Sequence, residues 1–407
     1  MTLKSIEINS YKSITEPVKV EEFSSFNILV GPNNAGKTNV LDAFEVFFNK
    51  EKESLQRKDA DINLVLETSS GEKKLSYSGG EIKRAAGSSL VRINNSNSLQ
   101  RIVNKELEDF KTENQEKYKE FSMILENYFQ DFQISESLFR SNIKTNPDKE
   151  SLSRMGEGFK RLFVMLFYIY NPRYEIILID EPEMHLHPSV IKKFLKILSK
   201  NELGCQILMT THHPTMVQAK FLDKTWRVSR NKNQSTAIHK FNKKYLDINI
   251  DRFVQEINDD NSAMLFADKV LLVEGVSDSI LMRGLIDKFH QTAEDIKVVY
   301  AGGVGDISLY EKVCKIFNIS YRIMIDGDML DFYWKKKFGE KPASKEKKRR
   351  KLKEENIFVL KGDLEDNYPK KYQKKDTKPL NALVAGNSIT KEDFSEMDEL
   401  KRVINYL

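Results

Sequence analysis

Short, nearly continuous apolar runs recur along this chain of 407 residues and fall into two groups. In the N-terminal half the runs lie at 26–30, 176–179 and 206–210. In the C-terminal half they lie at 271–273 and 323–325. Runs that do not alternate with polar residues are typical of strands buried on both faces of a parallel sheet. The pattern therefore predicts two successive α/β units.

Other segments show the patterns of helices and of a hairpin. Helices are predicted at 39–48, directly after the first apolar run, at 159–170 (FKRLFVMLFYIY) and at 279–289. The stretch 62–81 alternates polar and apolar residues on both sides of a glycine-containing turn, which predicts a β-hairpin. These elements supply the helices and the antiparallel strands that accompany the buried runs.

The boundary between the two units is predicted in the linker 250–266, which contains the turn-rich sequence INDDNS. Two short strands, at 225–229 and 237–241, are predicted to close the first unit before this linker. We therefore predict a first domain over 1–260 and a second over 267–407. Two or three domains are expected for a chain of this length.

Residues 31–38 read GPNNAGKT, which is the complete P-loop pattern between the strand and the helix that this motif requires. The two glycines allow the backbone to wrap around phosphate, and the amides at the helix N-terminus point towards it. Lys37 would neutralise the β- and γ-phosphates of ATP, and Thr38 would offer its hydroxyl to Mg²⁺. The predicted nucleotide contacts of this loop are Gly31, Asn33, Asn34, Gly36, Lys37 and Thr38.

A second motif, IILIDEPEMHLHP, occupies 176–188. Asp180 follows the buried run and would hold the water shell of the nucleotide's Mg²⁺. Glu181 would polarise the attacking water as a general base. The alternative interpretation is a strand followed by an acidic helix cap. The P-loop upstream favours the ATPase interpretation.

The sequence DEPEMHLHP resembles the ABC-type ATPases of the SMC, RecF and OLD group. The resemblance implies a switch histidine after the next strand, and His212 in the sequence THHP matches that position, with His213 as its neighbour. It also implies that a signature sequence of one subunit reaches the nucleotide of another. We therefore expect a homodimer or a higher oligomer linked by ATP.

Two segments are candidates for the signature. Residues 153–158 (SRMGEG) precede the predicted helix at 159–170 and lie about 25 residues before Asp180, which is the spacing and context of the family. Residues 78–81 (SGGE) are closer to the usual string but fall in the predicted hairpin. We select 153–158, with Ser153 and Gly156 as nucleotide contacts, and interpret 78–81 as a turn.

Acidic residues follow the two apolar runs of the second unit. VEGVSDSILM at 273–282 places Glu274 and Asp278 after one run, and IDGD at 325–328 places Asp326 and Asp328 after the other. Positions 326 and 328 of a strand end project to the same side, so both could hold one cation. The carboxyl ends of parallel strands meet at one rim of a sheet, where ligands bind. Carboxylates are hard oxygen ligands that suit Mg²⁺ or Mn²⁺. The alternative is that Ser277 or Asp278 merely caps the helix at 279–289.

These acids and their order resemble the Toprim domain of topoisomerases, primases and OLD-family nucleases. The resemblance implies a further acid in a strand-then-LE context, which Glu365 matches in FVLKGDLEDNYP, with Asp363 and Asp366 as close competitors. It also implies a catalytic lysine near a C-terminal helix, for which Lys378 is the candidate; Lys374 and Lys375 are alternatives. The implied metal ligands are Glu274, Asp278, Asp326, Asp328 and Glu365, and Glu274 is also assigned a catalytic role.

The charge is unevenly distributed, although the chain as a whole carries only +5. Segment 331–378 holds 17 Lys and Arg against 9 Asp and Glu, a net of +8, so the rest of the chain carries about −3. Positive charge beside the acidic motifs favours contact with a nucleic-acid backbone. The densest part is 345–355; its alternative is a solvated lysine-rich surface. The charged stretch 101–150 carries no motif that we can interpret.

Two cysteines and the absence of an apolar run of 18 residues favour a soluble, cytoplasmic protein without a membrane partner. The order of motifs along the whole chain resembles the OLD-family nucleases, in which an ABC-type P-loop ATPase domain precedes a Toprim α/β domain. The resemblance implies an ATP-regulated, metal-dependent DNA endonuclease of anti-phage defence, acting alone, beside a partner protein, or with the reverse transcriptase of a retron. The alternative function is an ATP-driven DNA clamp or sensor with a non-catalytic Toprim domain.

Overall fold

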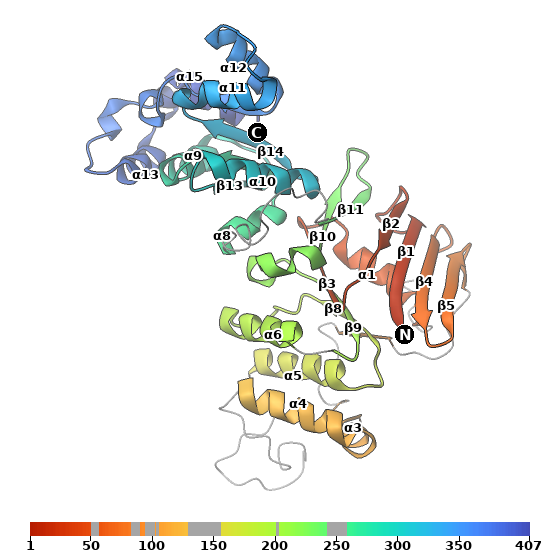
Figure 1. Cartoon of the computed structure of the whole chain (residues 1–407). Coiled ribbons are helices and arrows are strands. Elements are labelled where there is room, and N and C mark those ends of the chain that lie inside the picture. The colour runs from red at the N-terminus through yellow and green to blue at the C-terminus, as the bar shows by residue number, and fades with distance from the viewer. Residues whose placement is uncertain are drawn as a thin grey trace. The chain divides into compact units, whose positions relative to one another are not determined.

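The structure is a computed structural model of the whole chain, and it describes residues 1–49, 57–82, 90–93, 102, 106–128, 156–200, 203–241 and 259–407. The chain forms two compact units, Met1–Phe241 and Asn242–Leu407. Figure 1 shows the elements of each unit. Both are α/β units, as the apolar runs predicted.

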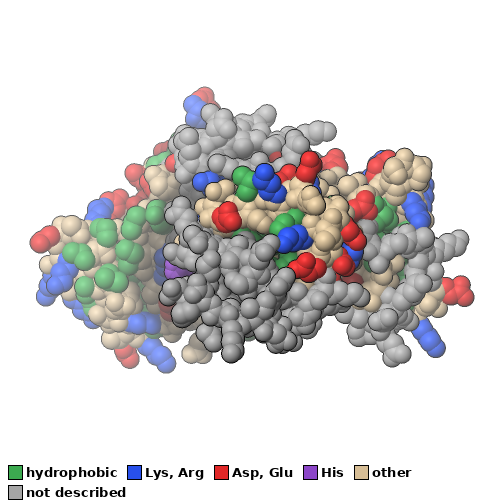
Figure 2. All heavy atoms as spheres, turned by 90° about the horizontal axis from the view of Figure 1, so that it is seen from below, with side chains coloured by type: hydrophobic (Ala, Val, Ile, Leu, Met, Phe, Trp, Pro, Cys, Tyr) green, Lys and Arg blue, Asp and Glu red, His purple; other side chains and the backbone are tan. Residues whose placement is uncertain are grey.

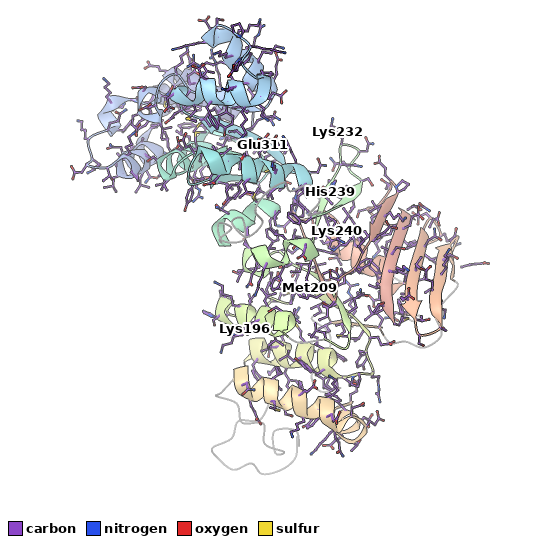
Figure 3. All side chains as sticks on the ribbon, viewed as in Figure 1. Lys196, Met209, Lys232, His239, Lys240 and Glu311 are labelled. Atoms are coloured by element: carbon purple, nitrogen blue, oxygen red, sulfur yellow. The ribbon has the colours of Figure 1, made fainter. Side chains whose placement is uncertain are left out.

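The first unit contains a six-stranded sheet in the order β11-β10-β3-β9-β8-β7. All neighbouring pairs are parallel except β10 with β11. The middle strands carry the three apolar runs and are almost fully buried; Met209, in the centre of β9, is labelled in Figure 3. The strands are β3 (Phe26–Val30), β7 (Leu90–Ile93), β8 (Ile176–Asp180), β9 (Gln206–Thr210), β10 (Thr225–Arg230) and β11 (Thr236–Lys240).

A five-stranded antiparallel sheet in the order β2-β1-β4-β5-β6 covers one side of the first unit. Helix α1 (Lys37–Glu45) belongs to the same hydrophobic core as this sheet and the inner face of the parallel sheet. The predicted hairpin is confirmed, and residues 78–81 form the turn between β5 and β6. The strands are β1 (Thr2–Ser10), β2 (Val18–Glu21), β4 (Asp61–Thr68), β5 (Gly71–Ser78) and β6 (Glu81–Ile82).

Helices form the other side of the first unit, where α4, α5 and α6 lie in successive layers (Figure 1). Helix α5 buries every residue from Leu162 to Tyr170, since it is covered on both sides. The helices are α3 (Leu107–Glu113), α4 (Gln115–Tyr128), α5 (Glu157–Tyr170) and α6 (Pro188–Lys200). On the face shown in Figure 2, basic and acidic side chains of the described residues are interspersed.

The second unit is built on a four-stranded, all-parallel sheet in the order β13-β12-β14-β15. Helices α9 and α13 cover one face and α10 packs on the other. Gly284 and Gly386 let α9 and α13 cross closely, because a Cβ at Gly284 would lie 2.8 Å from the Cα of Gly386. The strands are β12 (Lys269–Val273), β13 (Ile296–Tyr300), β14 (Ser320–Ile325) and β15 (Ile357–Val359).

The helices of the second unit include the predicted helix after Glu274, which begins at Val276, three residues earlier than expected. Its first turn is stabilised by the side chain of Asp278, which accepts a hydrogen bond from the Gly275 amide at 2.9 Å. The helices are α8 (Asp259–Ser262), α9 (Val276–Phe289), α10 (Val304–Ile316), α11 (Leu330–Phe338), α12 (Lys345–Glu354), α13 (Lys378–Ser388), α14 (Lys391–Glu396) and α15 (Asp398–Asn405).

A buried acid ties together the middle of the second unit. Glu311 of α10, labelled in Figure 3, accepts hydrogen bonds from Lys315 and Lys337 at 2.8 Å each and from the Tyr321 hydroxyl at 3.1 Å. Burial alone would raise the pKa of Glu311, but Lys315 and Lys337 lower it below its ordinary value.

Among the described residues, no helix has the length and the apolar character needed to span a membrane.

Candidate functional site

The P-loop follows β3 and is held against β10 and β11 by its two glycines. Gly31 has φ 142° and Gly36 has φ 103°, both in the region that favours glycine. A Cβ at Gly31 would lie 1.9 Å from the carbonyl oxygen of Val228, and one at Gly36 would lie 2.3 Å from the hydroxyl of Thr236. The glycines are therefore required by packing as well as by the shape of the loop.

Lys37 lies inside this loop with only 3% of its surface exposed. Its Nζ donates hydrogen bonds to the carbonyl oxygens of Gly31 and Pro32, both at 2.8 Å. Burial is the main cause that lowers the pKa of Lys37 to about 8, against the opposing charges of Glu181, Glu183 and Asp180. The loop opens on a pocket of about 500 Å³, lined by Asn33, Asn34, Ala35, Gly36, Lys37, Thr38, Asn39, His212 and Arg230.

The lowered pKa of Lys37 predicts how ATP affinity depends on pH. Phosphates favour the protonated amine, so its pKa is higher in the bound chain than in the free chain, where it is about 8. Below pH 8 the free chain already carries the proton, and affinity should not depend on this group. Above pH 8 binding requires proton uptake, so the Kd of ATP should rise by up to about tenfold per pH unit.

This pH dependence is measured with a non-hydrolysable ATP analogue between pH 7 and 9.5. Lys37→Arg is the matched control, because its guanidinium remains charged throughout this range. A slope above pH 8 that is equally steep in Lys37→Arg would show that another group is responsible.

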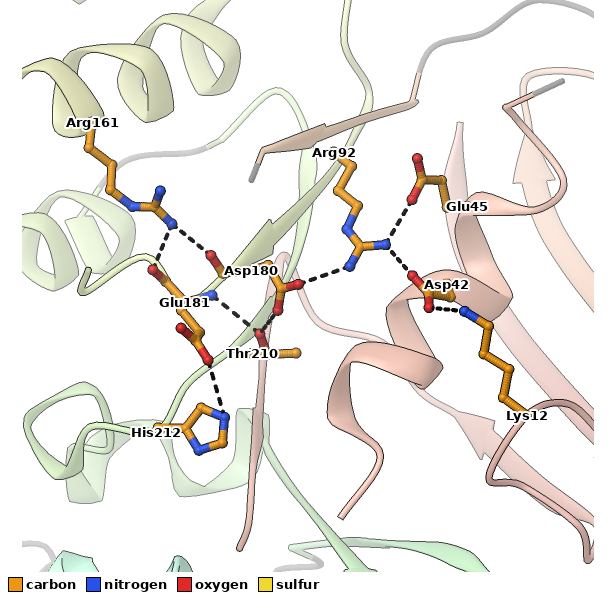
Figure 4. A network of polar contacts seen from close by, with 9 residues as sticks. All are labelled: Lys12, Asp42, Glu45, Arg92, Arg161, Asp180, Glu181, Thr210 and His212. Carbon is orange, nitrogen blue, oxygen red and sulfur yellow. Dashed lines mark hydrogen bonds and ion pairs between the residues drawn. The ribbon is translucent and has the colours of Figure 1, made fainter. Parts of the chain in front are cut away.

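The acids of the second motif stand where β8 ends, beside β9. Asp180 accepts a hydrogen bond from the Thr210 hydroxyl at 2.5 Å. Glu181 has φ 50°, a left-handed conformation that is strained for a residue other than glycine. Its Oε1 lies 3.2 Å from His212 Nε2, and burial lowers the pKa of that histidine. The structure thus brings Asp180, Glu181 and His212 together (Figure 4).

Sequence reasoning missed three residues that organise this region. Glu183 accepts hydrogen bonds from the Thr211 hydroxyl and the His212 amide, both at 2.8 Å, and so fixes the backbone of the histidine. Arg230 Nε donates to the carbonyl oxygen of Asn34 at 3.0 Å. Arg92 is the third, and its place inside the apolar stretch Leu90–Ile93 is the one signal that could have found it.

Arg92 joins the P-loop helix to the second motif. Its side chain is only 8% exposed, and it contacts Asp42 and, at 2.8 Å, Glu45, both on α1. Nη1 of Arg92 makes both of these contacts, and Nη2 donates a hydrogen bond to Asp180 Oδ2 at 2.9 Å. Lys12 contacts Asp42 from the far side (Figure 4). Arg92 therefore pairs with three carboxylates at once and fixes the direction of the Asp180 side chain.

Replacing Arg92 by Met should destabilise the first unit strongly. The change leaves Asp42, Glu45 and Asp180 with one cation fewer, and uncompensated buried charge costs about 3–5 kcal/mol. The measurement is urea unfolding. Lys4→Met is the matched control, because Lys4 pairs with Glu67 and Glu72 on the surface, where such a loss costs about 0–1 kcal/mol. Equal losses in the two variants would contradict a buried charge network.

The N-terminal part of α5 contacts the second motif from the other side. Arg161 donates to the carbonyl oxygens of Asp180 and Glu181, both at 2.7 Å (Figure 4). Gly158 packs so tightly that a Cβ would lie 2.4 Å from the carbonyl oxygen of His185. Gly156 is the exposed residue before the helix, and Ser153 lies outside the described residues. Arg161, three residues beyond the predicted signature, thus joins helix α5 to the main chain of the two acids.

The acids of the second unit collect at the carboxyl edge of its parallel sheet. Glu274 follows β12, and Asp326 follows the neighbouring β14. Burial raises the pKa of Asp326 to about 7, with further contributions from Asp278, Glu274, Asp363 and Asp328. Burial, Asp278 and Asp328 likewise raise the pKa of Glu274. The predicted acids therefore lie near enough to repel one another.

Asp328 reaches this edge by a different route from the one expected. We predicted that Asp326 and Asp328 project to the same side of one strand, but β14 ends at Ile325 and Asp328 lies in the 3-10 turn Gly327–Met329. The turn forms because the chain at 360–362 crosses here, with the Gly327 amide donating to the Gly362 carbonyl at 2.7 Å. A Cβ at Gly327 would lie 2.7 Å from the Gly362 amide nitrogen, so the middle residue of DGD is a packing glycine.

Asp278 and Glu365 both have protein partners. Asp278 caps its own helix, as the alternative interpretation predicted, and burial raises the pKa of its carboxyl group. Glu365 Oε2 accepts a hydrogen bond from Lys378 Nζ at 3.0 Å, which brings the candidate fifth acid and the candidate lysine together. Lys378 is the first residue of α13 and is exposed.

A divalent cation fits this edge by the chemistry of its atoms. Glu274 Oε2 and Asp326 Oδ1 are buried and, among the described residues, have no hydrogen-bond partner. Buried oxygens without partners are costly, and a cation would satisfy them and offset the repulsion among the acids. Within the described residues, no three acidic, His or Cys side chains are already arranged to hold a metal ion, and Asp278 and Glu365 have hydrogen-bond partners in the protein.

Comparisons with known proteins find different families in the first and the second unit. The family described as "Overcoming lysogenization defect protein-like, TOPRIM domain" matches residues 265–328. The "AAA ATPase domain" family matches 1–76, and "AAA domain, putative AbiEii toxin, Type IV TA system" matches 84–217. Residues 265–328 are thus similar to the Toprim domain of OLD-like proteins, and most of the first unit is similar to AAA ATPase domains. The predicted fold class, a P-loop ATPase domain followed by a Toprim domain, is confirmed.

Three OLD-family relatives are similar to parts of the chain. The "Old nuclease" of Escherichia phage P2 is 27% identical over 45% of this chain and 35% of its own length. The "OLD nuclease" of Thermus scotoductus is 29% identical over 38% of this chain and 31% of its own. The "Endonuclease GajA" of Bacillus cereus is 26% identical over 46% of this chain and 33% of its own. The matches thus span about a third of each of these relatives.

Proposed function

We propose that this chain is an ATP-regulated, metal-dependent endonuclease that hydrolyses phosphodiester bonds in DNA. The observation that carries the proposal is the pair of buried oxygens, on Glu274 and Asp326, that lack protein partners at the carboxyl edge of the second sheet. The names of the OLD-family relatives, two nucleases and an endonuclease, support the same chemistry. We assign Mg²⁺ or Mn²⁺ as the cation.

The acids and the lysine of the second unit would take different roles in DNA cleavage. Asp326 and Asp328 would hold the cation together with Glu274, Asp278 and Glu365, after Asp278 and Glu365 turn from their present partners. A bound divalent cation supplies charge stabilisation on the phosphate and lowers the pKa of water. Glu274, whose pKa is raised, is suited to orient the attacking water and accept its proton. Lys378, released from Glu365, would offset negative charge on the transition state.

In the first unit, Lys37 and Thr38 would bind the phosphates and the Mg²⁺ of ATP, with Gly31, Asn33, Asn34 and Gly36 supplying the loop. Asp180 would hold the water shell of that ion, and Glu181 would act as the general base with His212 beside it. The exposed Gly156, together with Ser153, would contact the nucleotide of a second subunit. We therefore propose that ATP links the chains into a homodimer or a larger oligomer.

We further propose that the endonuclease serves defence against phage, either alone or as the effector of a system with a partner protein, such as a retron. A cytoplasmic location and a DNA substrate follow from this proposal. The support is the resemblance to OLD-family relatives together with the net +8 of segment 331–378.

The second candidate is an ATP-driven DNA clamp or sensor with a non-catalytic Toprim domain. The hydrogen bonds that engage Asp278 and Glu365 within the protein favour it. Cleavage of supercoiled plasmid by the purified chain separates the two. The endonuclease should nick plasmid with Mg²⁺ or Mn²⁺ and stop with EDTA, and ATP should change its rate. DNA binding and ATP turnover without any cleavage would establish the clamp or sensor.

A further inference from the structure

A basic pocket lies in the second unit between α12, β15 and α15. It has a volume of about 400 Å³ and an apolar floor formed by Ile357, Phe358, Val359 and Val403. Its charged side chains come from segments far apart in the sequence. Five are cationic, against the acids Glu346 and Glu399: Arg349, Arg350, Lys353, Lys361 and Arg402.

The cations of this pocket outnumber the anions that neutralise them. Lys361 and Arg402 share a single oxygen, Glu399 Oε1, at 3.3 and 3.2 Å. Arg350 lies near Glu354, whose pKa is lowered by Lys351 and also by Arg350, and Lys351 is the residue that forms the ion pair with Glu354. Lys353 Nζ lies over the ring of Tyr406, 3.7 Å from its centroid. The pocket therefore has uncompensated positive charge.

Arg349 gives a second, independent indication of an anionic ligand. One of its Nη atoms donates to the carbonyl oxygen of Leu360 at 3.1 Å, which fixes the side chain at the pocket. Its Nε is buried and, within the described part of the chain, has no hydrogen-bond partner. A buried donor of a charged group without a partner is costly and rare. Phosphate oxygens are the acceptors that the arginine fork matches best.

The backbone segment after β15, which lines part of the pocket, is hydrogen-bonded to the acidic edge. The Leu360 amide donates to the carbonyl oxygen of Ile325 at 2.9 Å, directly before Asp326. The Gly362 carbonyl accepts from the Gly327 amide at 2.7 Å, directly before Asp328. Lys361 thus lies between two residues, Leu360 and Gly362, whose backbones are hydrogen-bonded to the segment that carries the acids.

We propose that this pocket binds an internal phosphate of the DNA backbone, next to the phosphate on which the acids act. The inference rests on the proposed endonuclease function and adds the residues that position its substrate. Cleavage would then require two neighbouring subsites, one acidic for the reacting phosphate and one basic for a flanking phosphate. A flanking contact fixes register without reading sequence.

The test uses two pairs of substitutions on the same helix, each removing two positive charges. Arg350→Ala with Lys353→Ala changes the pocket. Lys347→Ala with Lys351→Ala is the matched control, because neither residue lines the pocket. Binding of a fluorescent 20-base-pair duplex to the full chain is measured by anisotropy against salt concentration, without divalent metal.

The pocket pair should weaken duplex binding by about tenfold or more and lower the log–log salt slope by about 0.9 for each phosphate that is no longer neutralised. The control pair should change affinity by about twofold or less, as expected for charges that lie outside the pocket and act only through the salt-screened field. Equal losses from both pairs, or no loss from either, would overturn the pocket. Duplexes with 5′-hydroxyl and 5′-phosphate ends should bind alike; a pocket effect confined to 5′-phosphate ends would overturn the assignment to an internal phosphate.

These outcomes separate the pocket from the nuclease proposal. If the chain nicks plasmid but the pocket pair binds duplex as well as the control pair does, the nuclease proposal stands and the pocket proposal fails. If the chain never nicks plasmid but only the pocket pair of substitutions weakens duplex binding, the pocket proposal stands and the nuclease proposal fails. A wild-type chain that does not bind the duplex at any salt concentration would overturn the pocket as a DNA site.

Discussion

Replacing Asp328 by Ala is expected to reduce metal-dependent DNA cleavage by at least about a hundredfold, while the fold and ATP turnover stay at wild-type level. Asp328 is exposed on its 3-10 turn, so its removal leaves no cavity. Its charge contributes to raising the pKa of Glu274 and Asp326, so its loss relieves repulsion in the metal-free protein. The expected loss follows from removing a ligand that fixes the cation beside these two acids, since even outer partners of a metal site are worth about 10–100-fold.

The measurement combines plasmid nicking, thermal unfolding without metal, and ATP turnover for wild type and variant. Asp331→Ala is the matched control, because this acid lies three positions further on, pairs with Lys348 and is not among the main causes that raise the pKa of Asp326 or Glu274. We expect a thermal midpoint that is unchanged or slightly higher in Asp328→Ala. A lowered midpoint with proportionate loss of ATP turnover would mean that the residue is structural.

Glu181→Gln is expected to retain ATP binding and to slow hydrolysis by about 10²–10⁴-fold, the contribution of a general base. The amide keeps the size of the carboxylate and its proximity to His212, whose Nε2 lies 3.2 Å from Glu181 Oε1. The main-chain φ of 50° is retained as well, since it is fixed by the Glu181 amide, which donates to the Thr210 carbonyl at 3.2 Å. Trapped ATP should therefore drive the chains to associate.

Sedimentation of Glu181→Gln with and without ATP measures this association. Lys37→Ala is the control, because it removes the amine that the phosphates require and should sediment alike under both conditions. A monomer at all concentrations with ATP bound would contradict ATP-linked assembly through the segment that contains Gly156.

Local sequence patterns predicted the main strands and helices of both units, because each motif is short and directly follows a strand. The runs before Lys37, Asp180 and Glu274 are buried strands, and the order of strands and helices follows from them. The resemblance implied a switch histidine at His212, after the strand that follows Glu181. The structure places its Nε2 3.2 Å from Glu181 Oε1, because the two residues follow neighbouring parallel strands. The roles assigned to these residues remain predictions.

What the sequence did not predict depends on long-range packing. Arg92 is one arginine in a strand of four residues, and only the fold brings Asp42, Glu45 and Asp180 to it. Asp328 was placed on a strand because its own sequence gives no sign of the crossing at 360–362. The basic stretch 345–355 was recognised by composition alone. Its division into pocket-lining and outward residues depends on β15 and α15, which are distant in sequence.

The central claim is that the acids of the second unit cut DNA and that the ATPase unit controls when. The most direct test compares plasmid nicking by wild type, Asp328→Ala and Lys37→Ala in Mg²⁺ and in Mn²⁺, with and without ATP. We predict that wild type nicks at a rate that ATP changes, that Asp328→Ala does not nick, and that Lys37→Ala nicks at a rate that ATP no longer changes. Nicking by Asp328→Ala at the wild-type rate would contradict the claim.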